Sequence, residues 1–564
     1  MFSFQVQFVH PSPAHPHGTP ILIKTRLHLE TPDGLTEIGL APGDARLPLS
    51  ELLAHRGHPL NTRCGGRGLC GGCEVSLRSG ALRRLADGAP VAPEDRLRSC
   101  QLRIEEGSDA TVAVPARSLL KHEPAIVSEF KINVPWASDP LDPAARFGAA
   151  VDIGTTTVAL ILAELPSGRV LAVASAFNAQ IRFGEDVLTR IEMCHDNPDA
   201  VRQLQHAVAA ETIQPLIAEA CAEAGIGAAE LGVMTVAANT TMQHLLAGVD
   251  PSPLGVHPFK PVFLEHRTYA PSELGLAFGG PGAKVHLLPG PAAYVGADLA
   301  AGLVATGMLY DEGPSLLVDV GTNGEIIAKV GGRLVGCATA AGPAFEGAGL
   351  TSGTRGVKGA IERIALRDSP YAVELGVIGG DAARPIGICG SAYVDFLWEG
   401  RRRGIVQENG RFSDGFVKRA GAAIQADDYG RKLQLHPHGA SGPVWISEAD
   451  VARLLQAKAA IAAGINTLLG ALGTSAAAVR TVYLAGGFGL HLSLEHAIGC
   501  GLLPGFTPAQ IQVVGNTSLG GAFLALNDRS LLAEMEAACA RMEIVELNLQ
   551  PGFEDAYIDQ LMLP

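Results

Sequence analysis

Two short stretches far apart in the chain share one design, and they decide the fold. The first reads AAVDIGTTTVAL (residues 149–160) and the second reads LLVDVGTNGEII (residues 316–327). In each, an apolar strand ends at an Asp-x-Gly-Thr turn and a second strand follows. Their spacing of roughly 170 residues indicates a duplicated domain rather than a short solenoid repeat. We therefore predict an α/β domain over residues 148–564, with halves at roughly 148–312 and 313–564.

The two Asp-x-Gly-Thr turns have the chemistry of phosphate-binding loops. Glycine lets backbone N–H groups approach anionic oxygens, and threonine hydroxyls add hydrogen-bond donors. An aspartate cannot bind phosphate itself, so Asp152 and Asp319 are predicted to hold Mg²⁺ through water and to act catalytically on bound ATP. A third glycine-rich turn, LAGGFG (residues 484–489), follows a predicted strand at 481–483. Together the three turns are expected to enclose a nucleotide between the two halves.

The predicted nucleotide contacts are Gly154, Thr155, Thr156, Thr157, Gly321, Thr322, Asn323, Gly324, Gly486 and Gly487. One Asp-x-Gly-Thr turn alone would fit an ordinary hairpin equally well, and the presence of two copies favours phosphate binding. For Gly486 and Gly487, a turn that only packs a strand closely against a helix is the alternative.

A long amphipathic helix is predicted before the third turn. It opens at Ser447-Glu448-Ala449-Asp450, a variant of the capping box. Its buried stripe is predicted to contain Val451, Leu454, Leu455, Ile461, Ile465 and Leu468. Lys458 on the same helix is predicted to be solvated rather than to border the nucleotide.

Four of the 10 cysteines gather near the N-terminus, in the order Cys64-x5-Cys70-x2-Cys73 with Cys100 further on. This spacing is typical of a [2Fe–2S] ferredoxin, in which one loop supplies three thiolates and a later strand supplies the fourth. Five glycines in the loop let the backbone fold around iron and aim N–H groups at sulfur. The alternative is a four-cysteine zinc site, but zinc modules usually pair their ligands in two Cys-x2-Cys knuckles. The other six cysteines are predicted to be small buried side chains.

The segment around these cysteines has the character of a compact β-rich module. Residues 21–29 alternate, TPDG at 31–34 predicts a hairpin turn, and 48–54 predict one short helix. We place the module at residues 1–115. Residues 116–147 are rich in proline and show little periodicity, which predicts a linker.

Composition excludes several classes of function. Hydrophobic residues make up 47% of the 564 residues and charged residues 18%, so the chain can bury a large core. With 43 basic and 57 acidic side chains the net charge is −14, and no basic stripe is present, so nucleic acid is not an expected partner. The long apolar runs are interrupted by polar residues, and the first residues lack the regions of a signal peptide. We expect no membrane span and a cytoplasmic location.

With the three turns in place, residues 148–560 resemble the superfamily of acetate and sugar kinases, heat-shock chaperone ATPases and actin. A [2Fe–2S] ferredoxin module fused before such a domain resembles the ATP-dependent reductive activators of corrinoid proteins. Further motifs of that family are NTTMQHLL (239–246), AGPAFEG (341–347) and GNTSL (515–519). The resemblance implies the fold class α/β plus β-grasp, with a ferredoxin-like β-grasp domain followed by a duplicated actin-like ATPase domain.

The resemblance also implies an activity and its partners. An activator of this family is an ATP-hydrolysing iron–sulfur oxidoreductase, which passes one electron to the inactive Co(II) state of a corrinoid protein or cobalamin-dependent methyltransferase and restores Co(I). The implied cofactors are a [2Fe–2S] cluster, ATP and Mg²⁺, and the implied electron donor is a low-potential ferredoxin or flavoprotein reductase. A homodimer is the assembly considered. Two features depart from the family: the linker is too short for a further small domain, and Cys337-Ala338-Thr339 stands where relatives often have a serine.

Three other functions are weighed against this one. They are a small-molecule kinase with an iron–sulfur sensor, an ATP-dependent activator of a dehydratase with an iron–sulfur centre, and a nucleotide-gated binding protein of the chaperone type. A kinase has no need of a ferredoxin module, and a chaperone leaves the cluster unexplained. Dehydratase activators hold a [4Fe–4S] cluster between subunits, and the nucleotide-binding part shows no matching cysteine pair.

A few polar residues beyond the turns are candidates for the site. Glu346, beside Phe345 in a Gly/Pro loop, is predicted to face the nucleotide or partner and is assigned a catalytic role, with loop anchoring as the alternative. Asp298 either orients the attacking water or caps a helix. Asn178, Gln180 and Asp186 are predicted to line the cleft.

Overall fold

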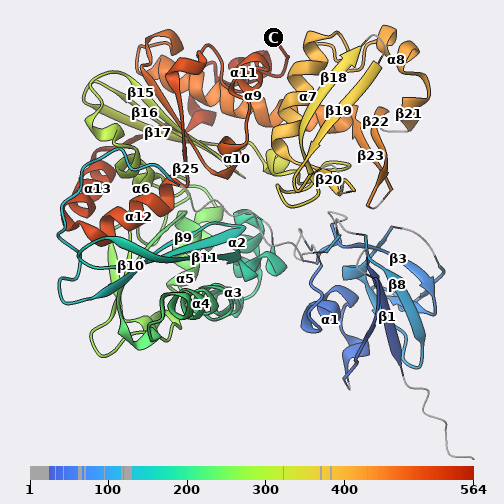
Figure 1. Ribbon diagram of the computed structural model, residues 1–564, viewed down its shortest axis with the longest axis horizontal. Helices are drawn as coiled ribbons and strands as arrows, with labels where there is room; N and C mark the ends of the chain where they lie inside the picture. Colours follow the sequence, from blue (N-terminus) through green and yellow to red (C-terminus); the bar gives the residue numbers. More distant parts are fainter. Residues whose placement is uncertain are drawn as a thin grey trace, which may run out of the picture.

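The structure is a computed structural model that describes the whole chain apart from the following residues: 1–24, 32–33, 42, 61, 63–65, 69–71, 94–95, 116–117, 120–129, 185, 322, 369–370, 381–383, 428–429 and 441. Figure 1 shows a small N-terminal module beside a larger body in which two sheet-containing lobes stack on each other. A further subdomain extends from the second lobe.

The N-terminal module, residues 25–119, is built on a mixed five-stranded sheet. Its strands run in the order β2 (Gly34–Ile38), β1 (Arg26–Thr31), β8 (Asp109–Ala113), β3 (Glu74–Ser79) and β6 (Leu97–Arg98). β1 pairs in parallel with β8 and antiparallel with β2, which forms the predicted hairpin around the turn at 31–34. Helix α1 (Leu49–His55) packs its buried leucines against β1. A second small sheet contains β5 (Pro90–Val91), β4 (Leu82–Arg84) and β7 (Leu102–Ile104).

Lobe I, residues 147–312, contains a six-stranded sheet. Its order is β11 (Arg169–Phe177), β10 (Thr157–Glu164), β9 (Phe147–Ile153), β12 (Leu231–Ala238), β14 (Lys284–Leu287) and β13 (Arg267–Tyr269). Its helices are α2 (Val187–Asp196), α3 (Ala200–Val208), α4 (Gln214–Ala224), α5 (Thr240–Leu246) and α6 (Ala297–Thr306). Helices cover both faces of this sheet, which is why β9 is a continuous apolar run rather than an alternating one.

Lobe II repeats the design. Its sheet has the order β25 (Ile511–Gly515), β24 (Thr481–Ala485), β15 (Ser315–Val320), β16 (Gly324–Val330), β17 (Arg333–Thr339) and β26 (Glu543–Ile544). β15 pairs antiparallel with β16 and parallel with β24, just as β9 pairs with β10 and β12. The duplicated domain that the two Asp-x-Gly-Thr stretches predict is therefore confirmed. The remaining helices of the lobe are α9 (Glu448–Ala471), α10 (Gly487–Leu490), α11 (Leu494–Gly499), α12 (Thr517–Asn527), α13 (Arg529–Arg541) and α14 (Phe553–Asp559).

A subdomain, residues 360–447, is inserted between β17 and α9 and forms the upper right of Figure 1. Its elements are β18 (Ala360–Asp368), β19 (Tyr371–Val377), β20 (Gly387–Ile388), α7 (Gly390–Arg402), α8 (Asp414–Ala420), β21 (Ile424–Asp427), β22 (Gly430–Gly439) and β23 (Gly442–Ser447). The N-terminus of α7 reaches the space between the lobes, so the subdomain contributes to the site.

Helix α9 begins where the sequence predicts. The Ser447 hydroxyl accepts from the Asp450 amide at 3.0 Å and the Ser447 amide donates to the Asp450 carboxylate at 2.9 Å, which completes the capping box. All six residues of the predicted stripe are buried. Within the described part of the chain, α9 alone is long and apolar enough to cross a membrane, but 72% of its apolar window is buried inside the protein, as in a core helix.

The prediction for Lys458 is wrong. Its side chain is fully buried, and Nζ donates to the backbone carbonyl of Met562 at 2.8 Å. The C-terminal residues fold over this part of α9 and remove the lysine from water, and this burial lowers the pKa of Lys458.

The chain crosses back to lobe I near its end. Helix α12 packs on α6 so closely that a Cβ on Gly521 would lie 2.1 Å from the Ala301 carbonyl oxygen. On its other side the same helix meets Phe130 and Trp136, which belong to the predicted linker and contact Phe523. In Figure 1 the red α12 accordingly lies between the two sheets. One face of the lobe I sheet is therefore covered by residues from the far end of the sequence.

Candidate functional site

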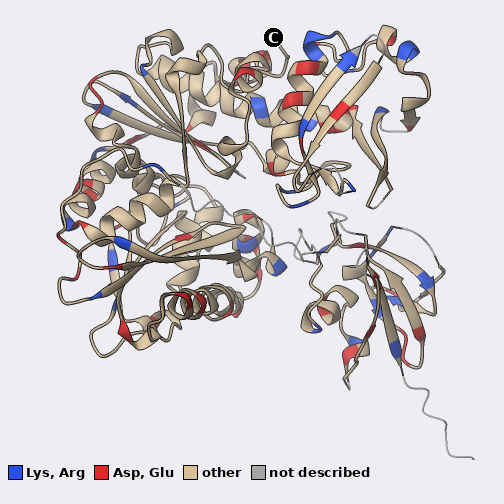
Figure 2. Cartoon of the chain, in the orientation of Figure 1, with Lys and Arg blue, Asp and Glu red and all other residues tan. Residues whose placement is uncertain are grey.

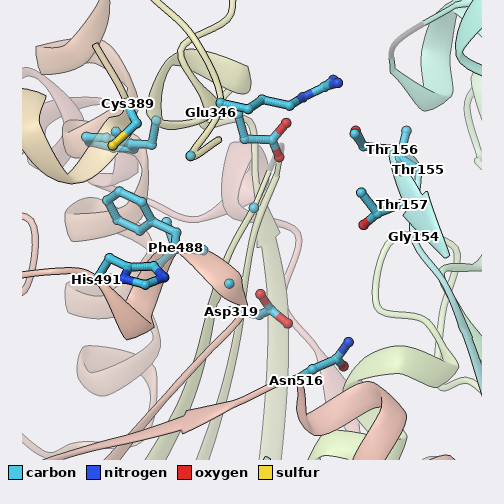
Figure 3. A pocket seen from close by; sticks show the side chains of 18 of the residues that line it. Gly154, Thr155, Thr156, Thr157, Asp319, Glu346, Cys389, Phe488, His491 and Asn516 are labelled. Carbon is cyan, nitrogen blue, oxygen red and sulfur yellow. The ribbon is translucent and has the colours of Figure 1, made fainter. Parts of the chain in front are cut away.

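The two lobes and the subdomain enclose a cavity of about 360 Å³. The turn after β9 and the turn after β15 face each other across it, and the turn after β24 lies beside the second of these. Figure 3 shows Thr155, Thr156 and Thr157 on one side and Asp319 and Glu346 on the other, directed into the same space. The structure thus brings together the three turns that the sequence singles out.

The first phosphate loop is closed by its own backbone. The Gly154 amide donates to the Thr157 carbonyl at 2.9 Å, and a Cβ on Gly154 would lie 2.8 Å from that same oxygen. Only glycine fits there, and the three threonines that follow line the cavity. The hydroxyl of Thr155 accepts from the Asn239 side chain at 3.2 Å, so the NTTMQHLL motif supports this loop.

Asn178, Gln180 and Asp186 do not line the cleft as predicted. Asn178 and Gln180 are fully buried behind the first phosphate loop, where the Asn178 side-chain amide donates to the Gly154 carbonyl at 3.0 Å. Asp186 caps helix α2 by accepting from the Thr189 amide at 2.7 Å. These polar side chains satisfy backbone groups next to the site, which is a use that sequence alone does not separate from lining it.

Asp152 lies at the end of β9 and is held from α12. The Asn516 side-chain amide donates to one carboxylate oxygen at 2.8 Å, and the Ser518 hydroxyl donates to the other at 2.7 Å. Burial raises the pKa of Asp152, and these two hydrogen bonds oppose the shift. The GNTSL motif therefore positions the first aspartate from 364 residues away.

The second phosphate loop follows β15. Its turn is closed by the Gly321 amide, which donates to the Asn323 carbonyl at 3.0 Å, and Asp319, Gly321 and Asn323 line the cavity. Gly324 does not line it but packs inward, where a Cβ would lie 2.7 Å from the Thr339 hydroxyl. Thr322 lies outside the described residues.

The third turn approaches the second aspartate closely. Gly486 has φ +87°, and a Cβ there would lie 2.7 Å from the Asp319 carboxylate. Glycine is thus required twice, by the left-handed backbone and by the carboxylate beside it. Gly487 opens helix α10 and also lines the cavity.

Four carboxylates converge at the bottom of the cavity: Asp152, Asp298, Asp319 and Glu325. Loss of solvent and the neighbouring Asp319 raise the pKa of Asp298 to about 7, and loss of solvent and Asp152 raise that of Asp319 to about 6. Burial also raises the pKa of Glu325 well above its usual range. So much negative potential favours a bound cation.

Within the described chain, no group of three or more His, Cys, Asp or Glu side chains has the geometry to ligate a metal directly. A cation here would complete its shell with water and phosphate oxygens, as Mg²⁺ commonly does. Asp298 sits in the first turn of α6 without capping it, since its side chain contacts only the next amide, at 2.9 Å. Glu325 was not predicted as a site residue. The feature that could have indicated it is a lone acidic residue inside the apolar strand β16.

The far end of the cavity is more apolar. Phe345 and Phe488 pack with ring centroids 5.3 Å apart, and Cys389, Ser391 and His491 complete the lining. Glu346 projects into the gap between the lobes (Figure 3). At the mouth, the Arg355 guanidinium lies 5.4 Å from the Phe177 ring of lobe I.

Cys73 and Cys100 lie together in the core of the N-terminal module. A hydrogen bond between the two thiol groups lowers the pKa of Cys73 to about 6. The Gln101 side-chain amide approaches the Cys100 sulfur at 3.7 Å. Cys64 and Cys70 lie outside the described residues. Five of the other six cysteines are buried, among them Cys389 at the cavity, and Cys539 is half-buried.

Thr339, near the position where relatives often carry a serine, does not line the cavity. Its side chain is buried between β16 and α9, next to Gly324 and Gly464. The residue faces the core of lobe II rather than the cavity, because successive side chains of β17 alternate between the two faces of the sheet.

Comparisons with known proteins agree with this architecture. Residues 147–311 match the model of the RACo middle region, and residues 313–564 match that of the C-terminal domain of RACo, the ASKHA domain. The chain belongs to the RACo family. Between them the two models account for both lobes, so the actin-like ASKHA fold is confirmed for this RACo family member.

Two relatives extend over nearly the whole chain, and a third matches part of it. The corrinoid activation enzyme RamQ of Eubacterium limosum is 28% identical and covers 91% of this chain and 96% of its own length. A solved structure named reductive activator for corrinoid, iron–sulfur protein is 29% identical, with a TM-score of 0.67 over 96% of this chain and 98% of its own. The [Co(II) methylated amine-specific corrinoid protein] reductase of Methanosarcina barkeri is 27% identical over 43% of this chain and 44% of its own.

Proposed function

We propose that this chain is an ATP-dependent reductive activator, which transfers one electron to the Co(II) state of a corrinoid protein and so restores Co(I). The observation that carries the proposal is the pairing of two sites in one chain: a module with adjacent buried thiols, and a duplicated ASKHA domain with a carboxylate-lined cleft. The names of the RACo relatives state corrinoid activation and Co(II) reduction.

We propose a ferredoxin-like β-grasp fold for residues 1–115, a linker at 116–147, and the two-halved ATPase at 148–564. A mixed sheet with one helix packed across it supports this assignment for the module. Cys73 and Cys100 fit a [2Fe–2S] cluster because they are adjacent and a side-chain N–H approaches one sulfur. Cys64 and Cys70 would complete the four thiolates. When bound, such a cluster would supply a one-electron carrier.

In the cleft, the aspartates would bind the cation and the threonines would bind the phosphates. Asp152 and Asp319 would hold Mg²⁺ through water, while the hydroxyls of Thr155, Thr156 and Thr157 would donate to phosphate oxygens. Asp298 would orient a water for attack on the terminal phosphate, with Glu325 beside it. Glu346 would face the nucleotide from lobe II.

The energetics explain why electron transfer is joined to ATP. Plant-type two-iron clusters have potentials near −400 mV, and corrinoid Co(II) is harder still to reduce. Each 100 mV uphill costs about 2.3 kcal/mol per electron. Closure of the lobes on ATP could stabilise the form that binds the reduced corrinoid, which would supply this energy by population shift.

The remaining partners follow from this function. The chain would receive electrons from a low-potential ferredoxin or flavoprotein reductase and would work in the cytoplasm. A homodimer is the proposed assembly. The electron donor does not need to approach the cleft, because the thiol site and the nucleotide site belong to separate parts of the chain.

The test is to mix the reduced protein with a Co(II) corrinoid protein under anaerobic conditions and to follow the absorbance of Co(I) with and without ATP. Co(I) is expected only with ATP. Cys100→Ser should abolish electron transfer and spare nucleotide binding, whereas Asp319→Ala should spare the cluster spectrum and abolish the ATP effect. Cys539→Ser serves as the matched thiol control.

Equal formation of Co(I) without nucleotide would contradict the proposal. So would a purified protein that stays colourless after anaerobic reconstitution with iron and sulfide. Phosphorylation of a small metabolite in place of cobalt reduction would favour the kinase alternative.

A further inference from the structure

Among the described residues near the cysteines, Arg67 makes a charged contact with lobe I. The Arg67 guanidinium donates to the Glu192 carboxylate of helix α2 at 2.7 Å and approaches the Thr189 carbonyl at 3.5 Å. Figure 1 shows the module beside the end of lobe I where α2 lies, and Figure 2 shows acidic and basic segments close together there. The contact therefore joins the thiol module to the nucleotide-binding body.

The two glycines that flank Arg67 are hydrogen-bonded to residues next to the buried thiol of Cys100. On one side the Gly66 carbonyl accepts from the Gln101 side chain at 2.7 Å, and on the other the Gly68 carbonyl accepts from Arg98. Arg98 and Gln101 bracket Cys100 in sequence, and both glycines have left-handed backbone, with φ +80° and +75°. A displacement of Arg67 would therefore also shift the backbone next to Cys100, because Arg98 and Gln101 are hydrogen-bonded to the two glycines that flank Arg67.

The same helix contacts the first phosphate loop through a residue two positions away. Arg190 is fully buried and donates to the Thr155 carbonyl, to the Gly184 carbonyl at 2.9 Å and to the Gln180 side chain at 2.8 Å. Since an arginine fork loses little freedom when its partners are fixed, it ties α2 firmly to the loop. Through Glu192, helix α2 contacts the module that holds the thiols, and through Arg190 it contacts the first phosphate loop.

We infer that helix α2 is the docking surface for residues 66–68 of the N-terminal module, and that Arg67 and Glu192 are positioning residues through which docking and nucleotide binding favour each other. Docking restrains α2, and a restrained α2 holds the Thr155 backbone in place before phosphate arrives. Coupling between binding events is reciprocal, so nucleotide must strengthen docking by the same factor. The inference rests on the proposed nucleotide site, but it needs no corrinoid chemistry.

The expected strength of the coupling between docking and nucleotide binding follows from how exposed the Arg67–Glu192 ion pair is to solvent. The Arg67 and Glu192 side chains are 40% and 60% exposed. Exposed ion pairs contribute little and are screened by salt, so we expect an effect of about two- to fivefold on nucleotide affinity at low ionic strength.

The test uses the full chain with its cluster reconstituted, and the Mg²⁺ complex of a non-hydrolysable ATP analogue as the probe. Hydrogen exchange of the segment containing residues 62–80 should slow when the analogue binds. Glu192→Lys should remove this response and weaken analogue binding about two- to fivefold. The double exchange Arg67→Glu with Glu192→Arg should restore both. Glu30→Lys is the matched control, since Glu30 pairs with Arg78 within the module at 3.6 Å.

An unchanged exchange rate in the cysteine segment on analogue binding would overturn the inference. So would an equal effect of Glu30→Lys, or failure of the double exchange to restore the response when each protein keeps its cluster spectrum. These outcomes are separate from the proposed function, because cobalt reduction could succeed with no docking and docking could occur in a protein that reduces nothing.

Discussion

The Ser518 hydroxyl donates to the Asp152 carboxylate at 2.7 Å, across 366 positions of sequence. Asp152 belongs to the first strand of lobe I, and Ser518 belongs to a helix near the end of the chain. The first phosphate loop and its aspartate are therefore assembled from both ends of the ATPase domain. A hydrogen bond to a carboxylate that has lost most of its water is among the stronger ones in proteins.

Replacing this hydroxyl should weaken the nucleotide site. A hydrogen bond to a charged group is worth roughly 1.5–3 kcal/mol, so Ser518→Ala should raise the KM for ATP about tenfold or more. The matched control is Ser530→Ala, whose hydroxyl donates to Asp528 at 2.6 Å outside the cavity lining. Steady-state ATPase kinetics of the two variants decide the matter. An equal KM for both variants would mean that Asp152 does not need the Ser518 hydroxyl.

A methyl group at Gly486 should displace Asp319. Its Cβ would lie 2.7 Å from the carboxylate, and the φ of +87° adds backbone strain. We expect Gly486→Ala to lower the kcat for ATP about 100-fold or more, as expected when a cation-holding group moves by an ångström. Gly473→Ala separates the two effects, because Gly473 has φ +64° but nothing within 4 Å of its Cβ position. Similar losses in the two variants would assign the effect to strain alone.

The carboxylate cluster should make the metal-free protein less stable as the pH rises. An aspartate whose folded pKa of about 7 exceeds its usual 3.8 keeps its proton longer in the folded state. The unfolded chain then binds fewer protons, and the free energy of unfolding falls between about pH 4 and pH 7. One pKa unit corresponds to about 1.4 kcal/mol.

Asp298→Asn should therefore be more stable than the parent at pH 8 by up to about 4 kcal/mol without Mg²⁺, and nearly equal to it at pH 4. Urea denaturation with a chelator at several pH values measures this difference. The exposed Asp555→Asn should show no such trend. A constant difference between parent and Asp298→Asn across the pH range would refute the explanation.

Lys458 should tolerate methionine better than alanine. Its stem is packed inside lobe II, and its amine donates a hydrogen bond to the Met562 carbonyl. Alanine leaves a cavity, which costs roughly 2–5 kcal/mol for a side chain of this size. Methionine fills the space and spares the cost of burying an amine. We expect Lys458→Met to be about 2 kcal/mol more stable than Lys458→Ala in chemical denaturation, and equal losses would mean that the charge itself is needed.

Local patterns predicted the parts of the site that depend on neighbours in sequence. The Asp-x-Gly-Thr turns lie between strands, as predicted, because apolar runs and glycine turns are local signals. Helix α9 begins directly after its N-cap Ser447, as predicted, because a capping box involves only four residues. Asp298 was predicted for the site only as an alternative to a helix cap, and its convergence with Glu325 and the two aspartates was not predicted, because it depends on how distant elements fold together. Asn178 and Asp186 show the same limit, since a polar side chain near a loop can serve the backbone as readily as a ligand.

The error at Lys458 has the same origin. A lysine on a helix is usually solvated, and only the C-terminal segment, 104 residues further on, removes it from water. The cysteine spacing, by contrast, indicates a set of metal ligands from the sequence alone and does not depend on how distant elements pack. Its two described members, Cys73 and Cys100, do lie together.

The return of helix α12 to lobe I constrains how the chain is made. Ala522 and Phe523 cover a face of the lobe I sheet that begins at Phe147. During synthesis, the part of that alanine-rich face that α12 covers stays exposed to solvent until nearly the whole polypeptide has left the ribosome. We therefore expect the first lobe to complete its folding only after α12 has been synthesised, and a fragment ending near residue 312 to need the C-terminal piece supplied in trans for stability.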